Sequence, residues 1–180
     1  MIESKTIGEI MIPLEKYPHV YDTCTLREAI AEMRKCEIIN HDGRRSSPRD
    51  LLVFDAAEVL VGSLRRRDIL RGLEPSFMLG DKPYYKEKLF DVAVDANLFQ
   101  LSYDKVLDEM QKRAGERVTK VMIPLISVVN SGDHILKAIK EMVDNNCSIL
   151  PVLDNDEIVG VVRTIDVMYE MALFLKIKTD

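Results

Sequence analysis

The feature that most constrains the fold of this chain is an internal repeat, in which four short segments return in the same order. The matching pairs are 10–13 (IMIP) with 121–124 (VMIP), 29–33 (AIAEM) with 138–142 (AIKEM), 53–55 (VFD) with 152–154 (VLD), and 62–68 (GSLRRRD) with 160–166 (GVVRTID). A repeat of this length indicates one supersecondary unit that is built twice and packs against its own copy. The sequence therefore predicts two equivalent units within its 180 residues.

Each copy contains the pattern of the same secondary structure elements. Apolar residues at helical spacing occupy 26–33 and 135–143, and Thr25 with Glu28 forms a capping box, with Asp133 in the equivalent region of the second copy. Two short apolar strands follow in each copy, and a second helix ends the copy, beginning near Ile69 and spanning 167–178. The first copy is longer around Tyr17 and around 40–49, where turn residues predict exposed loops.

In these segments the chain resembles a CBS domain pair, also called a Bateman module. The opening turns (10–13 and 121–124), the strand 151–154 (PVLD) and the closing segments (62–68 and 160–166) are similar to that family's motifs. The resemblance implies an α/β (α+β) fold of tandem CBS domains, with two β-α-β-β-α repeats related by pseudo-twofold symmetry and two clefts between them. We expect repeat 1 over 1–73, a linker with a helix over 74–117, and repeat 2 over 118–180.

The resemblance also implies a function, which is a regulatory and non-catalytic module that senses AMP, ADP or ATP and needs no cofactor. The family's closing aspartate receives the ribose hydroxyls, so Asp68 and Asp166 are the expected ribose contacts. Residues near the opening turn and second strand enclose the base, which points to Ile12, Ile123 and Pro151. Physical chemistry supports this use, because a carboxylate accepts two bonds from a vicinal diol and a helix start favours phosphate.

The sequence departs from the family at the residue three positions after the closing glycine, which is Arg65 in one copy and Arg163 in the other instead of Thr or Ser. Thr164 supplies a hydroxyl nearby, out of register. Each arginine could bind phosphate through its planar fork, pair with the following aspartate and block the cleft, or lie in solvent. Arg66, within the run 65–67, could likewise grip a polyphosphate or be a solvated residue at a helix start.

Charge and composition exclude several other classes of function. The net charge is −5, and seven arginines between 44 and 71 favour a phosphate-sized anion over a duplex, so nucleic acid is an unlikely partner. The histidines and cysteines lack the spacing of a metal site or a nucleophile–base set, so no enzyme is indicated. Three sparse cysteines, no apolar run long enough for a bilayer, and no signal peptide predict a cytoplasmic protein.

Two helices are candidates for contacts with other molecules. Residues 103–114 have helical spacing, with Ser102 as a candidate cap and Gly115 as a stop, and this helix either packs on the module or docks a partner protein. The last helix, 167–178, is apolar nearly all round, which predicts burial on more than one side and a homodimer contact. The alternative function is a ligand-free dimerisation or scaffold module with closed clefts.

Overall fold

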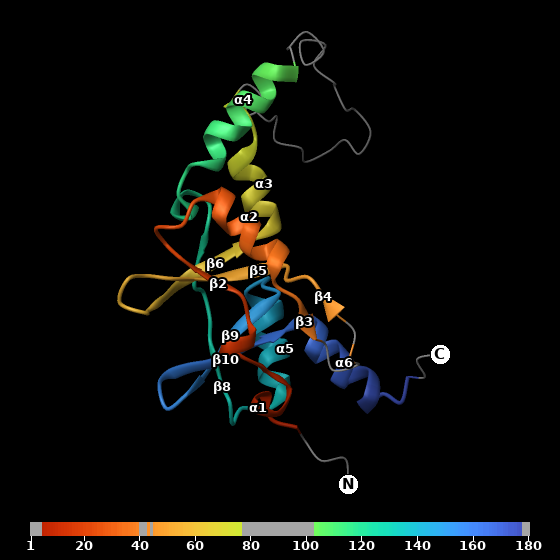
Figure 1. The fold of residues 1–180 in the computed structure, drawn as a ribbon. Coiled ribbons are helices and arrows are strands. Elements are labelled where there is room, and N and C mark those ends of the chain that lie inside the picture. Colours follow the sequence, from red (N-terminus) through yellow and green to blue (C-terminus); the bar gives the residue numbers. More distant parts are fainter. Residues whose placement is uncertain (1–4, 40–42, 44, 77–102, 178–180) are drawn as a thin grey trace.

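The computed structural model of the chain describes residues 5–39, 43, 45–76 and 103–177, and it contains two four-stranded sheets (Figure 1). The elements of the first half are α1 (Ile7–Ile10), β1 (Ile12–Pro13), η1 (Leu14–Lys16), β2 (His19–Tyr21), α2 (Leu26–Lys35), β3 (Ile38–Ile39), β4 (Arg45–Ser46), β5 (Asp50–Phe54), β6 (Leu60–Arg65) and α3 (Arg66–Leu73). Those of the second half are α4 (Tyr103–Ala114), η4 (Val118–Lys120), β7 (Ile123–Pro124), β8 (Val129–Asn130), α5 (Ile135–Asp144), β9 (Ile149–Asp154), β10 (Glu157–Arg163) and α6 (Thr164–Phe174).

The predicted pair of β-α-β-β-α units is confirmed. One unit runs β2, α2, β5, β6, α3, with the short β3–β4 pair inserted, and the other runs β8, α5, β9, β10, α6. In each unit the first strand pairs parallel to the second, and the second pairs antiparallel to the third. The same topology in both copies is the structural counterpart of the sequence repeat.

The sheets are buried on both faces, as the alternation of side chains along β5 shows. Leu51 and Val53 pack into the core under α2 and α3, whereas Leu52 and Phe54 point the other way and contact residues of the second sheet. That inter-sheet core also contains Ile149 and Val161. The two units therefore pack sheet to sheet, with their helices outside, and any groove between them is lined by strand residues of both copies.

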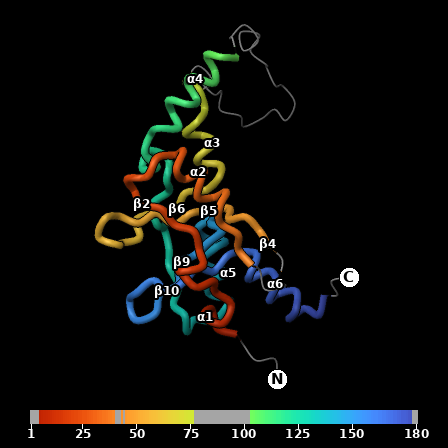
Figure 2. The backbone as a smooth tube through the Cα atoms, viewed as in Figure 1, coloured from red at the N-terminus to blue at the C-terminus, as the bar shows by residue number. Residues whose placement is uncertain are grey.

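The two units exchange their opening strands. β1 pairs with β10 of the second unit, and β7 pairs with β6 of the first. Figure 2 shows the N-terminal segment running beside β10, at the opposite end of the molecule from α3. The exchange needs glycine, because a Cβ on Gly62 would lie 2.4 Å from the carbonyl oxygen of Ile123, and one on Gly160 would lie 2.5 Å from that of Ile12.

Helix boundaries follow the predicted caps in part. The capping box of Thr25 and Glu28 is present, with Glu28 Oε2 accepting from the Thr25 backbone N–H at 2.8 Å. In the second unit the N-cap of α5 is His134, whose Nδ1 accepts from the backbone of Leu136, and Asp133 instead accepts from the backbone N–H of Asn130. Asp133 therefore stabilises the preceding turn and does not cap the helix.

The linker helix α4 has the predicted length and packs against α2 and α3. Its candidate cap Ser102, like Asn40, His41 and Arg44 of the predicted exposed loop, lies outside the described residues. Within those residues, no helix is long and apolar enough to cross a bilayer.

The last helix is buried on one side only within the single chain. Within the chain α6 buries only Asp166, Val167 and Glu170, and its apolar side chains on the other side are exposed, among them Met168 at 64% and Leu173 at 54%. Within the described chain α6 covers one face of its sheet, and no element covers its outer side. The predicted burial of that outer side in a homodimer contact stays a prediction.

Candidate functional site

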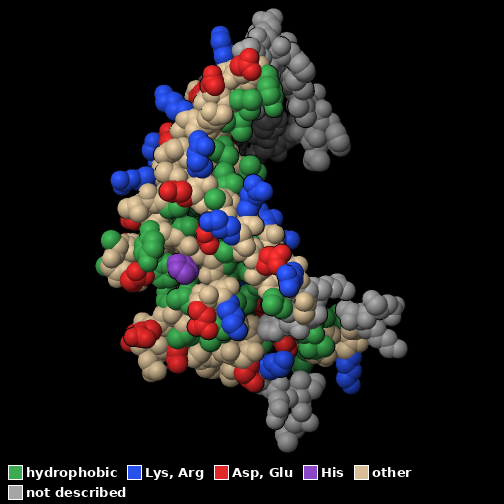
Figure 3. Space-filling view, in the orientation of Figure 1, with side chains coloured by type: hydrophobic (Ala, Val, Ile, Leu, Met, Phe, Trp, Pro, Cys, Tyr) green, Lys and Arg blue, Asp and Glu red, His purple; other side chains and the backbone are tan. Residues whose placement is uncertain are grey.

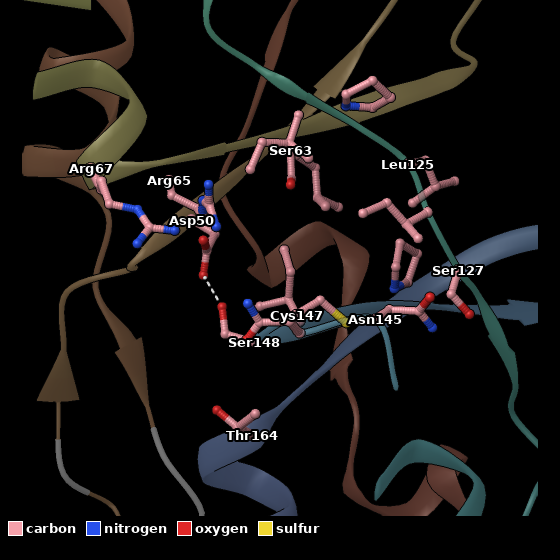
Figure 4. A pocket seen from close by; sticks show the side chains of 17 residues that line it. Asp50, Ser63, Arg65, Arg67, Leu125, Ser127, Asn145, Cys147, Ser148 and Thr164 are labelled. Atoms are coloured by element: carbon pink, nitrogen blue, oxygen red, sulfur yellow. Dashed lines mark hydrogen bonds between the residues drawn. The ribbon is translucent and has the colours of Figure 1, made fainter. Parts of the chain in front are cut away.

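A cleft of about 550 Å³ opens between the two sheets and is lined by residues of both units (Figure 4). From the first unit the lining residues are Asp50, Leu52, Ser63, Arg65 and Arg67. From the second half of the chain they are Ile123 to Ser127, Asn145 to Ile149, Pro151 and Thr164. Its volume lies within the range of about 300–1,000 Å³ that small-molecule sites occupy.

Two arginines line one end of the cleft. Arg65 and Arg67 line it, at the junction of β6 and α3. Arg66 does not, because successive side chains leave the chain in different directions, and its guanidinium donates instead to the carbonyl oxygens of Pro48 and Ser47. Through these bonds Arg66 stabilises the loop before β5, and contact of Arg66 with a ligand stays a prediction.

The arginines that end the closing strands each form a bidentate ion pair with the aspartate three residues later. Arg65 donates to Asp68 from Nε at 2.7 Å and from Nη2 at 3.0 Å. Arg163 donates to Asp166 from Nε at 2.8 Å and from Nη2 at 2.6 Å. The pairs close because the arginine is the N-cap of its helix and the aspartate is the third helical residue, whose carboxylate also reaches the cap backbone N–H. Of the three roles predicted for these arginines, the structure shows the ion pair.

The carboxylates that the sequence places first as ribose contacts are buried in these pairs. Asp68 is 0% exposed, Asp166 is 1% exposed, and neither lines the cleft. Burial raises the pKa of Asp68, but the hydrogen bonds and charge of Arg65 outweigh it, so the net shift is below the ordinary value. Ribose binding by these residues stays a prediction, and it requires Arg65 or Arg163 to release its partner.

One part of the cleft wall is apolar. Ile123 and Pro151, predicted to enclose a base, lie on it together with Leu52. Thr164, predicted as a nearby hydroxyl, also lines the cleft, and so does Ser63. Ile12 lies elsewhere, because it belongs to the exchanged strand β1 and pairs with Val161 of β10.

Sequence reasoning missed the buried carboxylate of this cleft, Asp50. It is 2% exposed, and its Oδ2 accepts from the hydroxyl of Ser148 at 3.3 Å, across the boundary between the units. Burial raises the pKa of Asp50, although Ser148 and the charge of Arg65 act in the opposite direction. The available signal was an acidic residue at the start of an otherwise apolar strand, DLLVF, in which every residue is buried.

The equivalent space beside Arg163 is filled by the chain itself. Tyr17, 2% exposed, packs with Ile12, Leu52 and Val161 between the sheets, and η1 packs against β10. Burial, with the nearby charge of Asp50, raises the pKa of Tyr17. The additional residues of the first copy around Tyr17 therefore fill part of the space between the sheets on this side.

A smaller opening of about 490 Å³ remains outside Tyr17, and its lining residues are Met11, Ile12, Pro13, Lys16, Glu37, Ile38 and Ile39. It does not include Arg163. The two pseudo-symmetric sites consequently differ, and the cleft beside Arg65 is the one that combines an apolar wall with an arginine end.

Comparison with known proteins assigns the fold. The family model for the CBS domain matches residues 7–75 and 118–173, which is more than half of the chain. The chain belongs to the CBS-domain family. The two matches make it a CBS pair, in agreement with the resemblance noted in the sequence.

Solved structures of other CBS pairs have the same architecture. CBSX2 from Arabidopsis thaliana is 18% identical, with a TM-score of 0.60 over 98% of this chain and 99% of that chain. CBSX2 in complex with AMP is 18% identical, with a TM-score of 0.59 over 96% of this chain and 98% of that chain. The CBS domain of a CBS-domain-containing membrane protein from Sphaerobacter thermophilus is 18% identical, with a TM-score of 0.62 over 93% of this chain and 88% of that chain. At these identities the likeness shows the fold alone, and comparison with curated protein sequences gives no significant match.

Other kinds of site find little support in the described residues of this CBS pair. No group of three or more His, Cys, Asp or Glu side chains there could hold a metal ion. On the face shown in Figure 3, lysines and arginines are interspersed with aspartates and glutamates and form no continuous basic stripe. The cleft beside Arg65 is therefore the candidate site.

Proposed function

We propose that this CBS pair is a regulatory module, and not an enzyme, that binds one adenine nucleotide (AMP, ADP or ATP) per chain in the cleft beside Arg65. The observation that carries the proposal is the composition of this cleft, which has one apolar wall and one arginine end. An apolar wall suits a purine ring, and a planar guanidinium suits phosphate. The AMP complex of a protein with the same fold supports the choice of adenine.

In this arrangement Ile123 and Pro151 contact the base, and Arg67 contacts the phosphate with help from Thr164. Arg67 is suited to an anion because it is exposed and forms no ion pair among the described residues, whereas Arg65 is held by Asp68. No cofactor is required. Because the lining comes from both units, the ligand favours whichever arrangement of the two units closes around it, and the changed surface is the signal to a partner protein.

The first test is binding of AMP, ADP and ATP by calorimetry, with guanine nucleotides and a cyclic dinucleotide as comparisons. We expect one molecule of an adenine nucleotide per chain, and at a concentration 100 times Kd it should raise the free energy of unfolding by about 2.7 kcal/mol.

Arg67→Ala should weaken binding by about tenfold or more, since a hydrogen bond to a charged group is lost. Arg34→Ala, an exposed arginine on α2, is the matched control. The absence of binding by any adenine nucleotide at millimolar concentration would end the proposal.

A second candidate function is the ligand-free scaffold with closed clefts, and the two Arg–Asp pairs favour it. Arg163 and Asp166 are buried, and Tyr17 fills the space beside them. The cleft beside Arg65 remains open, however, which is why we place nucleotide binding first. A stable dimer whose melting temperature does not respond to any nucleotide would favour the scaffold.

We propose that the partner of the exposed face of α6 is a second copy of the chain. The face consists of Ile165, Met168, Tyr169, Leu173 and Phe174, whose exposed fractions run from 37% to 64%. Clustered apolar side chains of this size mark an interaction surface.

We further propose that the protein works in the cytoplasm, because all three cysteines are free thiols, as expected in a reducing compartment.

The dimer is tested by light scattering after size exclusion. The wild-type chain should have twice the mass of a monomer, and Leu173→Glu should reduce it to the monomer, because a charge in an apolar interface is not paired. Leu136→Glu on α5, a leucine with 61% exposure outside this face, is the matched control and should stay dimeric. A monomeric wild-type protein at micromolar concentration would contradict the proposal.

A further inference from the structure

Asp50 is the one acidic side chain among the described residues that line the cleft. It is the first residue of β5, directly opposite Arg65 in the pairing of β5 with β6. Figure 4 shows its side chain beside Arg65, with Ser148 on the far side. The carboxylate therefore lies between the arginine end of the cleft and the second unit.

The Asp50 carboxylate is poorly satisfied for a buried group. Among the described residues its only hydrogen-bond donor is the hydroxyl of Ser148, at 3.3 Å, which is longer than the range of about 2.5–3.0 Å for O–H···O bonds. An ionised carboxylate has about four acceptor sites, so most of its capacity is unused. Burying a charge without compensating bonds destabilises the folded state.

Asp50 and Asp68 differ in their hydrogen bonding and in their access to the cleft, so a ligand in the cleft can contact Asp50 but not Asp68. Asp68 accepts two bonds from Arg65 and one from the backbone, and it does not line the cleft. Its pKa is lowered overall, whereas burial raises the pKa of Asp50. A raised pKa in the folded state means that Asp50 favours folding only at acidic pH and destabilises the protein once it ionises as the pH rises. At neutral pH the chain keeps Asp50 at a cost in stability, which is typical of functional groups.

We propose that Asp50 is the carboxylate that recognises the ligand, by accepting hydrogen bonds from the two vicinal hydroxyls of the ribose. The inference rests on the proposed nucleotide function and moves the ribose contact from Asp68 to a residue of the strand β5. It agrees with Figure 4, where Asp50 lies between Arg67 and the apolar residue Leu125, as the ribose lies between phosphate and base. Since Ser148 belongs to the other unit, a ligand on Asp50 also acts at the boundary between the units.

The test compares Asp50→Asn with the wild type for AMP and for its 2′-deoxy analogue. Asparagine keeps the shape and one acceptor but removes the charge. We expect Asp50→Asn to weaken AMP binding by about tenfold or more, and the wild-type preference for AMP over 2′-deoxy-AMP to disappear in the variant. The apo variant should melt at a higher temperature than the wild type, because the buried charge is gone. Asp108→Asn, the same change at an exposed position of α4, is the control and should leave all three quantities unchanged.

Each result separates the two proposals. Wild-type protein that binds no adenine nucleotide would end the nucleotide function and the role of Asp50 together. Binding that Asp50→Asn leaves unchanged, or a variant that still prefers the ribose form, would overturn the role of Asp50 alone. A loss of binding accompanied by a lower melting temperature would also overturn it, because Asp50 would then be a structural residue.

Discussion

Arg163→Ala is expected to lower the free energy of unfolding by about 3–5 kcal/mol, measured by urea denaturation at pH 7. The variant leaves Asp166, which is 1% exposed, as a buried carboxylate without its bidentate partner. Removing one member of a buried ion pair is far more costly than removing both, since the remaining charge is uncompensated. The side chain of Arg163 is itself only 10% exposed, so little water can replace the guanidinium.

Arg65→Ala is the matched comparison at the pseudo-symmetric position, and it should lower the free energy of unfolding by less than Arg163→Ala does. The Arg65 side chain is 28% exposed, and Arg71 provides a second cation with Nη1 at 3.9 Å from Asp68 Oδ1. Replacing both members of the second pair, in Arg163→Met with Asp166→Leu, should recover most of the stability. Equal losses for the two single variants, or a double variant as unstable as Arg163→Ala, would show that burial of the charge is not the cause.

The two-unit architecture could be predicted from the sequence because its determinants are local. The repeat predicted two units, the capping box at Thr25 predicted the start of a helix, and the short apolar segment 51–54 predicted a strand, and the structure contains all three. The exchange of β1 and β7 between the units could not be predicted in this way. It depends on pairing between residues about 150 positions apart for β1 and β10, and the local pattern of IMIP is the same whichever sheet it joins.

Some of the expected site residues line the cleft and others do not, and the difference has a physical cause. Arg65, Ile123, Pro151 and Thr164 line the cleft, but Asp68 and Asp166 do not. In the sequence an arginine and an aspartate three residues apart are compatible with a ligand site and with a closed ion pair. The ion pair forms because the start of the helix places the aspartate, its third residue, beside the arginine at the N-cap.

The difference between the two clefts also could not be predicted from the sequence. The additional residues around Tyr17 predicted a longer loop, and extra loop residues ordinarily lie in solvent. Here the loop turns inward, and the phenol ring becomes part of the core between the sheets. A large aromatic residue in such an insertion, with Pro18 beside it, was the signal that the segment had its own packing role.

Tyr17→Ala is expected to lower the free energy of unfolding by about 3–5 kcal/mol, because it empties the space between the sheets that the ring fills. Tyr17→Phe separates the ring from its hydroxyl. The hydroxyl has no hydrogen-bond partner among the described residues, and burying such a group is unfavourable, so Tyr17→Phe should be neutral or up to about 1 kcal/mol more stable than the wild type. Both variants are measured by urea denaturation at pH 7, where the buried phenol stays protonated. If Tyr17→Phe were as unstable as Tyr17→Ala, the hydroxyl and not the ring would hold the sheets together, and the packing role of the insertion would be wrong.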